Sequence, residues 1–213
     1  IEVIYSGTDT ERFHPGVDGN AIRAELGVSR DQFLITQVGV RSWRGNDDVL
    51  DAMAEVVAQA PDARLLFVGA PAPRIPVLLD QARARRLDGC VHVWGHREDI
   101  AEILAAADLT VDAAYAGAGL TGSLRESLAV ETPVVGTMLE GIPELVREGE
   151  TGLLVPPRSP EALARAILWV KAHPVEAKGM ARAGRKRVEA DFSTEVKVQR
   201  TEALYRHLLA ARS

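Results

Sequence analysis

The stretch of residues 109–137, LTVDAAYAGAGLTGSLRESLAVETPVVGT, contains the pattern that decides the fold. Two short apolar runs at its ends, residues 109–111 and 134–137, predict buried strands. Between them a glycine-rich loop leads into residues 123–130, whose apolar spacing predicts a helix. A strand, a helix and a second strand in this order indicate a βαβ unit, in which the two strands are parallel.

The same alternation of strands and helices runs through the residues before this unit. Further strands are predicted at residues 1–5, 33–38, 64–68 and 91–94, with helices at residues 46–59, 75–86 and 98–106. After residue 159 the pattern is helical: Pro160 starts a helix, Pro174 interrupts it, and residues 192–194 introduce a last helix through Ala211. Strands that are apolar on both faces predict the α/β class, with a doubly wound, Rossmann-like parallel sheet.

The composition is that of a globular protein with a net negative charge. Of the 213 residues, 46% are hydrophobic and 26% are charged, which suits one large α/β domain or two small ones. Lys and Arg number 25 against 30 Asp and Glu, so the net charge is −5 at pH 7. General attraction to nucleic acid or to anionic lipid is therefore not expected, and an anionic ligand needs a local binding site.

Cysteine usage and hydropathy indicate a reduced compartment. The one cysteine, Cys90, cannot form an internal disulfide, and the cysteine and histidine residues lack the spacing of a metal site. Three acidic residues interrupt the most apolar stretch, residues 101–120, so no membrane span is predicted. We expect a cytoplasmic location and no bound metal. Because the sequence opens on Ile1 without a signal-type segment, we expect it to be part of a longer protein.

The longest predicted strand-end loop, residues 112–122, leads into a helix. Ligands of doubly wound folds bind at the carboxyl ends of the strands, and N–H groups at a helix start bind anions without a basic side chain. Glu126, early in that helix, carries a carboxylate that suits sugar hydroxyls. The alternative is that Ser123 caps the helix and forms a capping box with Glu126.

A further alternative for this loop is a dinucleotide site. Gly117, Gly119 and Gly122 have the spacing G-x-G-x-x-G. That fingerprint normally follows the first strand of its unit directly, whereas residues 112–116 here separate the strand from the first glycine. The context therefore favours a different use of these glycines.

Two arginines follow the predicted strand at residues 33–38. Arg41 and Arg44 lie at its carboxyl end, where guanidinium groups can clamp a diphosphate through paired N–H donors. The alternative is an ion pair with Asp47 or Asp48.

His96 is the one histidine in a predicted strand-end loop. The sequence contains no Walker-type, serine-elbow or metalloprotease motif.

Taken together, these segments resemble the carboxy-terminal half of family 4 glycosyltransferases with the GT-B fold. The resemblance covers nearly the whole chain, and its motifs occur in the family's order. Residues 4–9 with Phe13 and Pro15 are similar to I-P-N-G-V-D…F-P, and residues 38–45 are similar to V-G-R-x…K-G. The most specific stretch is RESLAVETPVV at residues 125–135, which is similar to L-E-A-M-A-x-G-x-P-V-V and is continued by residues 140–146 and 151–156.

The resemblance implies a nucleotide-sugar donor domain at residues 1–190 and a helix at residues 191–213 that packs toward an amino-terminal acceptor domain outside this sequence. It implies a retaining transfer that uses neither a metal nor another cofactor, with a nucleoside diphosphate sugar as the partner. The implied catalytic residues are Arg44, in place of the family's phosphate-binding Lys, and Glu126, which binds ribose hydroxyls. The implied donor-binding residues are Arg41, Arg44, Gly95, His96, Arg97, Leu120, Thr121, Gly122, Ser123 and Glu126.

One departure from the family pattern leaves the activity open. The first Glu of the family's E-x7-E motif falls on Ala118, which cannot hydrogen-bond the donor sugar through its side chain. A nucleotide-sugar-binding or assembly module without activity is one alternative, and a GT-B protein with another reaction, an epimerase or a phosphorylase, is a second. We also expect residues 194–211 to expose an apolar face, which predicts self-association. The missing domain is expected to allow peripheral contact with a membrane.

Overall fold

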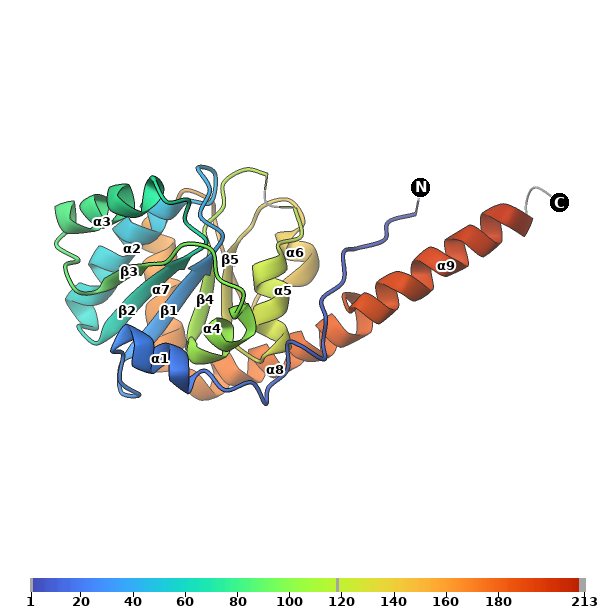
Figure 1. The fold of residues 1–213 in the computed structure, drawn as a ribbon, viewed down its shortest axis with the longest axis horizontal. Coiled ribbons are helices and arrows are strands. Elements are labelled where there is room, and N and C mark those ends of the chain that lie inside the picture. The colour runs from blue at the N-terminus through green and yellow to red at the C-terminus, as the bar shows by residue number, and fades with distance from the viewer. Residues whose placement is uncertain (1, 118, 211–213) are drawn as a thin grey trace.

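The computed structural model describes residues 2–117 and 119–210, and its central feature is a parallel sheet (Figure 1). Six strands form this sheet in the order β3-β2-β1-β4-β5-β6, and every neighbouring pair is parallel. They are β1 (Phe33–Val38), β2 (Ala63–Val68), β3 (Val91–Val93), β4 (Leu109–Asp112), β5 (Val134–Thr137) and β6 (Leu153–Val155). Ile35 of β1 pairs with Leu65 on one side and with Leu109 on the other. The predicted doubly wound fold is confirmed.

Helices cover both faces of the sheet. One face carries α2 (Asn46–Gln59), α3 (Arg74–Ala84) and α7 (Pro160–Ala172), and the other carries α1 (Asn20–Leu26), α4 (Ile100–Ala106) and α5 (Gly122–Ala129). Leu34 of β1 belongs to the core under α1 and α4, while Ile35 belongs to the core under α2 and α7, and neither is exposed. Successive strand residues point to opposite faces, which is why a strand covered on both sides has a continuous apolar sequence.

The prediction of a strand at residues 1–5 is wrong. Residues 2–5 lie outside the sheet, and residue 1 is not among the described residues. Tyr5 packs against Phe192, with ring centroids 5.1 Å apart, and its hydroxyl donates a hydrogen bond to Glu144. Tyr5 therefore packs at a helical corner instead of joining a strand edge, while Val3 is exposed. Strand β6 and the short helices α1 and α6 (Ile142–Leu145) were not predicted from the sequence, because their brief patterns give little periodicity.

The strand order places a topological switch point between β1 and β4. From β1 the chain moves outward to β2 and β3, returns through α4 to β4, and continues in the other direction to β5 and β6. In doubly wound folds the ligand binds where the strand order reverses, outside the carboxyl ends of the strands. The loops at this point are residues 39–45 after β1 and residues 113–121 after β4.

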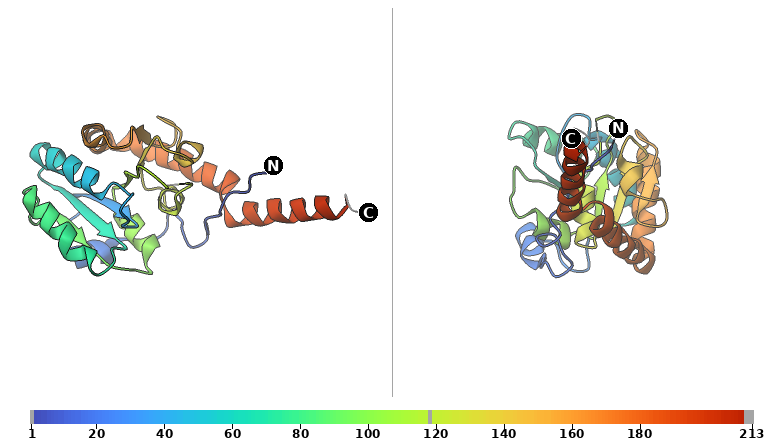
Figure 2. Two further views of the ribbon diagram at one scale, coloured as in Figure 1. Left: turned by 90° about the horizontal axis from the view of Figure 1, so that it is seen from above. Right: turned by 90° about the vertical axis from the view of Figure 1, so that its right-hand side faces the viewer.

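The last two helices differ in their contact with the core. α8 (Pro174–Asp191) packs against the core through Val188, whereas α9 (Thr194–Ala210) extends beyond the body of the protein (Figure 2). The start of α9 is fixed by Thr8, whose N–H donates to the Phe192 carbonyl (2.8 Å) and whose carbonyl accepts from the Thr194 N–H (2.9 Å). The predicted apolar exposure is confirmed over residues 194–210, and Ala211 lies outside the described residues. The exposed apolar residues of α9 are Val198, Tyr205, Leu208 and Leu209.

Candidate functional site

The loops after β1 and β4 form one unit at the switch point. Gly45 has φ +64°, and a Cβ at this position would lie 2.1 Å from the Ala113 carbonyl oxygen, so only glycine permits this approach. The Tyr115 N–H donates to the Trp43 carbonyl (3.0 Å), and the Tyr115 hydroxyl donates to the Ser42 carbonyl (2.7 Å). Groups on the two loops are therefore held at a fixed separation.

Arg44 is held by a carboxylate at the end of β4. Its Nη1 donates to Asp112 Oδ2, and the side chains of Arg44 and Asp112 are 17% and 1% exposed. The second oxygen of Asp112 accepts the Ala114 N–H at 3.1 Å. The alternative of an Arg44 ion pair with Asp47 or Asp48 is wrong, because the buried carboxylate of Asp112 lies closer along the sheet edge. Asp112 was not assigned to the site from the sequence. The signal that could have identified it is a carboxylate at the end of a buried strand.

Buried amides fix the backbone around Arg41. The Asn46 side chain donates to the Arg41 carbonyl (2.9 Å), and the Gln37 side chain donates to Asn46 Oδ1 (2.9 Å) and to the Arg44 carbonyl (3.1 Å). Gln37 and Asn46 are 1% and 3% exposed, whereas Arg41 is exposed. The Arg41 guanidinium donates to the neighbouring Val40 carbonyl at 2.8 Å and leaves further N–H groups for an anion.

The start of α5 has no side-chain cap. Thr121 is the N-cap residue and makes no capping hydrogen bond, and its buried Oγ1 has no partner among the described residues. The capping-box alternative is wrong: the helix begins at Gly122, so Ser123 lies inside the first turn and Glu126 lies beyond it. Leu120 is half-buried at the end of the loop. The first amides of α5 therefore lack intrahelical acceptors and suit a bound anion.

Glu126 presents a half-buried carboxylate at this helix start. A Cβ on Gly122 would lie 3.6 Å from Glu126 Oε1, so the side chain turns back toward the amino end of α5. Burial raises the pKa of Glu126 above its ordinary value, against the opposing charges of Arg125 and Arg12. Over residues 2–117 and 119–210, no hydrogen bond to this carboxylate is found. Its oxygens suit the hydroxyls of a ligand.

The predicted residues 95–97 lie two strands away from the switch point, after the edge strand β3. The Gly95 carbonyl accepts the Gly69 N–H at 2.9 Å, which ties this loop to the end of β2. The Arg97 guanidinium binds both carboxylate oxygens of Glu25 (2.9 and 3.0 Å) and also Asp99, and it stacks over the Trp94 ring. The Arg97 side chain is thus engaged in structural ion pairs, while His96 is exposed.

Glu140 is a residue of this region that sequence reasoning missed. Its carboxylate accepts the N–H groups of Gly117 (3.0 Å) and Gly119 (2.8 Å). These glycines bind a protein carboxylate well past the end of β4, an arrangement that does not support the dinucleotide alternative. Ala118, the position of the family departure, lies outside the described residues.

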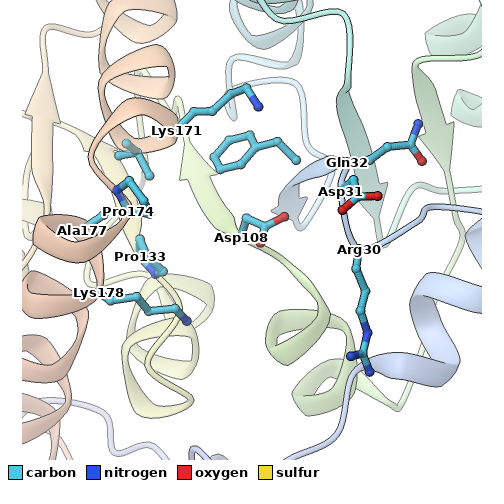
Figure 3. Close-up of a pocket in the computed structure, with 11 residues that line it drawn as sticks. Arg30, Asp31, Gln32, Asp108, Pro133, Lys171, Pro174, Ala177 and Lys178 are labelled. Atoms are coloured by element: carbon cyan, nitrogen blue, oxygen red, sulfur yellow. The ribbon is translucent and has the colours of Figure 1, made fainter.

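A separate cavity of about 180 Å³ lies at the opposite, amino ends of the strands. Figure 3 shows the residues that line it. Arg30 and Phe33 line it beside β1, and Asp108 lines it before β4. Three of its charged groups have protein partners: Asp108 pairs with Arg23, Lys171 pairs with Asp62, and Lys178 donates to the Glu131 carbonyl. This cavity shares no residue with the switch-point site.

No group of three or more His, Cys, Asp or Glu residues that could hold a metal ion occurs in the described part of the chain. None of the helices described has both the length and the apolar character needed to cross a membrane.

Comparisons with known proteins agree with the fold. Residues 32–173 match the family model described as glycosyl transferases group 1. The D-inositol 3-phosphate glycosyltransferase of Rhodococcus erythropolis is 33% identical over 177 residues, which cover 78% of this chain and 39% of that protein. Sucrose-phosphate synthase from Thermosynechococcus elongatus superposes with a TM-score of 0.86 at 31% identity, over 99% of this chain and 53% of that one. Anabaena HepE, solved in complex with UDP and glucose, superposes with a TM-score of 0.87 at 25% identity, over 96% and 56%.

The parallel sheet, its strand order and its structural neighbours define a domain of the GT-B glycosyltransferase fold. The chain belongs to the glycosyl transferases group 1 family. It spans 39–57% of the length of the curated relatives it matches, which is consistent with the carboxy-terminal half of a GT-B protein.

Proposed function

We propose that this chain is the donor-binding half of a retaining glycosyltransferase that uses a nucleoside diphosphate sugar without a metal ion. The observation that carries the proposal is the presence of two suitable groups, Glu126 and Arg44, at the switch point. Among the described residues nothing donates a hydrogen bond to the Glu126 carboxylate, which lies beside the uncapped start of α5, and Arg44 is fixed on the adjoining loop. A nucleoside diphosphate sugar has hydroxyls for the first group and a diphosphate for the second. The structural neighbour HepE was solved in complex with UDP and glucose, the two components of such a ligand.

The order of the loops along the sheet edge suits an elongated ligand. Neighbouring strands lie about 4.8 Å apart, so the loop after β3 is roughly 10 Å from the loop after β1. In this proposal the base lies against the backbone of residues 95–97. The diphosphate lies between Arg44 and the amides of Leu120, Thr121 and Gly122, and Glu126 binds the ribose hydroxyls.

The proposed reaction depends mainly on stabilisation of the leaving group. The bond between the anomeric carbon and the diphosphate oxygen breaks, and negative charge grows on the departing diphosphate. The acceptor hydroxyl oxygen forms the new bond to the anomeric carbon, and its proton passes to the departing diphosphate. Arg44, Arg41 and the amides at the start of α5 stabilise that charge through groups already fixed in place. The acceptor is bound outside this chain, so the chain alone binds the donor nucleotide and transfers little sugar. Closure of the two halves completes the site.

Calorimetric titration of the chain with UDP, GDP, ADP and dTDP in the presence of EDTA tests this proposal. We expect one nucleotide to bind selectively, and Arg44→Ala and Glu126→Gln each to weaken it by about 10- to 100-fold, because each removes a charge-assisted hydrogen bond. Arg83→Ala serves as the matched control, since Arg83 forms an exposed pair with Asp80 within α3. Failure of all four nucleotides to bind the native chain would contradict the proposal.

A binding module without activity is the second candidate, because Ala118 stands where the family resemblance places a carboxylate. The two candidates share the nucleotide site and differ in turnover. The full-length protein, supplied with the labelled sugar form of the selected nucleotide and a panel of acceptors, distinguishes them. Transfer of label supports the enzyme, and nucleotide-sugar binding without transfer to any acceptor supports the module.

A further inference from the structure

The Glu140 carboxylate binds the glycine-rich loop from the neighbouring strand end. Its Oε1 accepts the Gly117 N–H at 3.0 Å, and its Oε2 accepts the Gly119 N–H at 2.8 Å. Both carboxylate oxygens are thus used on the two amides that flank position 118. Because Glu140 follows β5 and the glycines follow β4, these bonds join two loops at the carboxyl edge of the sheet.

The backbone at Glu140 is unfavourable for a glutamate. Its φ is +46°, in the left-handed region that residues other than Gly, Asn and Asp rarely adopt. Glycine would suit this turn better on local grounds. Backbone strain at a non-glycine residue points to a role for the side chain, and the contact with Gly117 and Gly119 is the role that the structure shows.

The loop that Glu140 binds needs an external partner to keep one shape. Gly117 and Gly119 are exposed and have φ of +59° and +51°, and glycine restricts the backbone less than any other residue. The same loop begins after Asp112, which holds Arg44, and ends at Thr121, the N-cap of α5. Fixing its middle therefore fixes the connection between the two proposed diphosphate-binding groups.

The contact between Glu140 and the two glycine amides lies at one end of the proposed donor site. If the base lies after β3 and the diphosphate lies at β1 and β4, the ligand continues along the sheet edge toward β5. A Cβ on Gly141 would lie 3.0 Å from the Gly119 carbonyl carbon, so the β5 loop and the glycine turn are in contact there. A nucleotide that ends at its diphosphate stops before this turn, whereas the attached sugar reaches it.

We propose that Glu140 is a positioning residue for the donor sugar: its carboxylate fixes the backbone amides of Gly117 and Gly119, against which the sugar of the nucleotide sugar binds. This inference rests on the proposed function. Glu140 acts through the two backbone amides, so its removal should affect recognition of the sugar and spare recognition of the nucleotide.

The test compares the selected nucleoside diphosphate with its glucose or mannose derivative by calorimetry, on the native chain, Glu140→Gln and Glu140→Gly. We expect the native chain to bind the sugar derivative more tightly than the nucleotide. Both variants should weaken binding of the sugar derivative at least tenfold and change binding of the nucleotide less than twofold. Glu140→Gly relieves the left-handed backbone, so a folded variant is available if Glu140→Gln does not fold. Glu150→Gln, at an exposed pair with Arg147, is the matched control.

A spectroscopic readout separates this role from a general structural one. In ¹H–¹⁵N spectra the amide protons of Gly117 and Gly119 should move upfield in Glu140→Gln, because they lose the carboxylate acceptor, while amides of β1 stay in place. Equal losses of nucleotide and sugar-nucleotide affinity, unchanged affinities, or a native chain that does not distinguish the two ligands would overturn the inference. A native chain that binds neither ligand would instead overturn the proposed function.

Discussion

The Arg44 guanidinium donates a hydrogen bond to the buried carboxylate of Asp112, and this contact joins the two loops at the switch point of the sheet. Asp112 is 1% exposed and cannot be solvated, so Arg44 supplies its compensating charge. Arg44 gains a fixed position from the same contact. A basic group fixed in this way stabilises a bound diphosphate without a reorganisation cost.

Replacement of Asp112 by Asn tests this pairing. We expect Asp112→Asn to lower the free energy of unfolding by about 2 kcal/mol, because hydrogen bonds to charged groups contribute about 1.5–3 kcal/mol. Nucleotide affinity should also fall, because Arg44 loses its fixed position. Urea denaturation and calorimetry measure the two effects. The control is Asp80→Asn at the exposed Arg83 pair, with an expected change below about 0.5 kcal/mol, and an equally small change in Asp112→Asn would refute the pairing.

Replacement of the Glu126 carboxylate is expected to have opposite effects on folding stability and on nucleotide binding. Its folded-state pKa is raised by burial above the ordinary value of 4.5, so the protonated form is favoured in the folded chain. The stabilising contribution of that protonation is full below the unfolded pKa and is lost as the pH rises through the folded pKa.

Glu126→Gln should therefore raise Tm relative to the native chain at pH 7, while it weakens nucleotide binding. The gain in Tm should shrink as the pH is lowered toward 4, where the native carboxyl is protonated as well. Thermal unfolding from pH 4 to pH 8 measures this difference. A variant less stable than the native chain at pH 7 would show that Glu126 has a structural partner.

The Arg97 side chain is expected to contribute more to folding stability than to nucleotide binding. Its ion pairs with Glu25 and Asp99 and its position over Trp94 predict that Arg97→Ala destabilises the chain by about 1 kcal/mol. Nucleotide affinity should change less than threefold, in contrast to Arg44→Ala. Parallel denaturation and titration test this, and a loss of affinity as large as that of Arg44→Ala would place the Arg97 side chain in the site.

The exposed apolar residues of α9 predict concentration-dependent self-association of the chain. Tyr205 and Leu209 are 63% and 68% exposed, and Leu208 is 51% exposed, on a helix that projects from the body of the protein (Figure 2). Clustered apolar surface of this kind associates in water. Sedimentation velocity over a range of concentrations should show larger species that a Leu208→Ser, Leu209→Ser double variant reduces. A strictly monomeric native chain would contradict the prediction.

Most of the strands and the helix after the glycine-rich loop could be predicted because their signals are local. The apolar runs at residues 33–38 and 134–137 occur as β1 and β5, and the glycine loop before residue 122 leads into α5 as expected. The prediction of a strand at residues 1–5 failed because residues 2–5 lie outside the sheet, where Tyr5 packs against Phe192. Local sequence does not contain that information.

The contacts that complete the site could not be predicted, because they join residues distant in sequence. Asp112 reaches Arg44 only after β4 is placed beside β1, and Glu140 reaches Gly117 only after β5 is placed beside β4. The positive φ of Glu140 is likewise invisible in the sequence, since glutamate gives no turn signal. The structure therefore adds two carboxylates to a site predicted from arginines, glycines and Glu126.

The most direct test of the central claim is a ¹H–¹⁵N titration of the chain with the nucleoside diphosphate selected by calorimetry. We predict that the amides of Gly122, Ser123 and residues 39–45 shift on binding, while those around the cavity of Figure 3, at Arg30 and Lys178, do not. Shifts confined to that cavity, or no shift at the switch point under saturation, would contradict a donor site between β1 and β4.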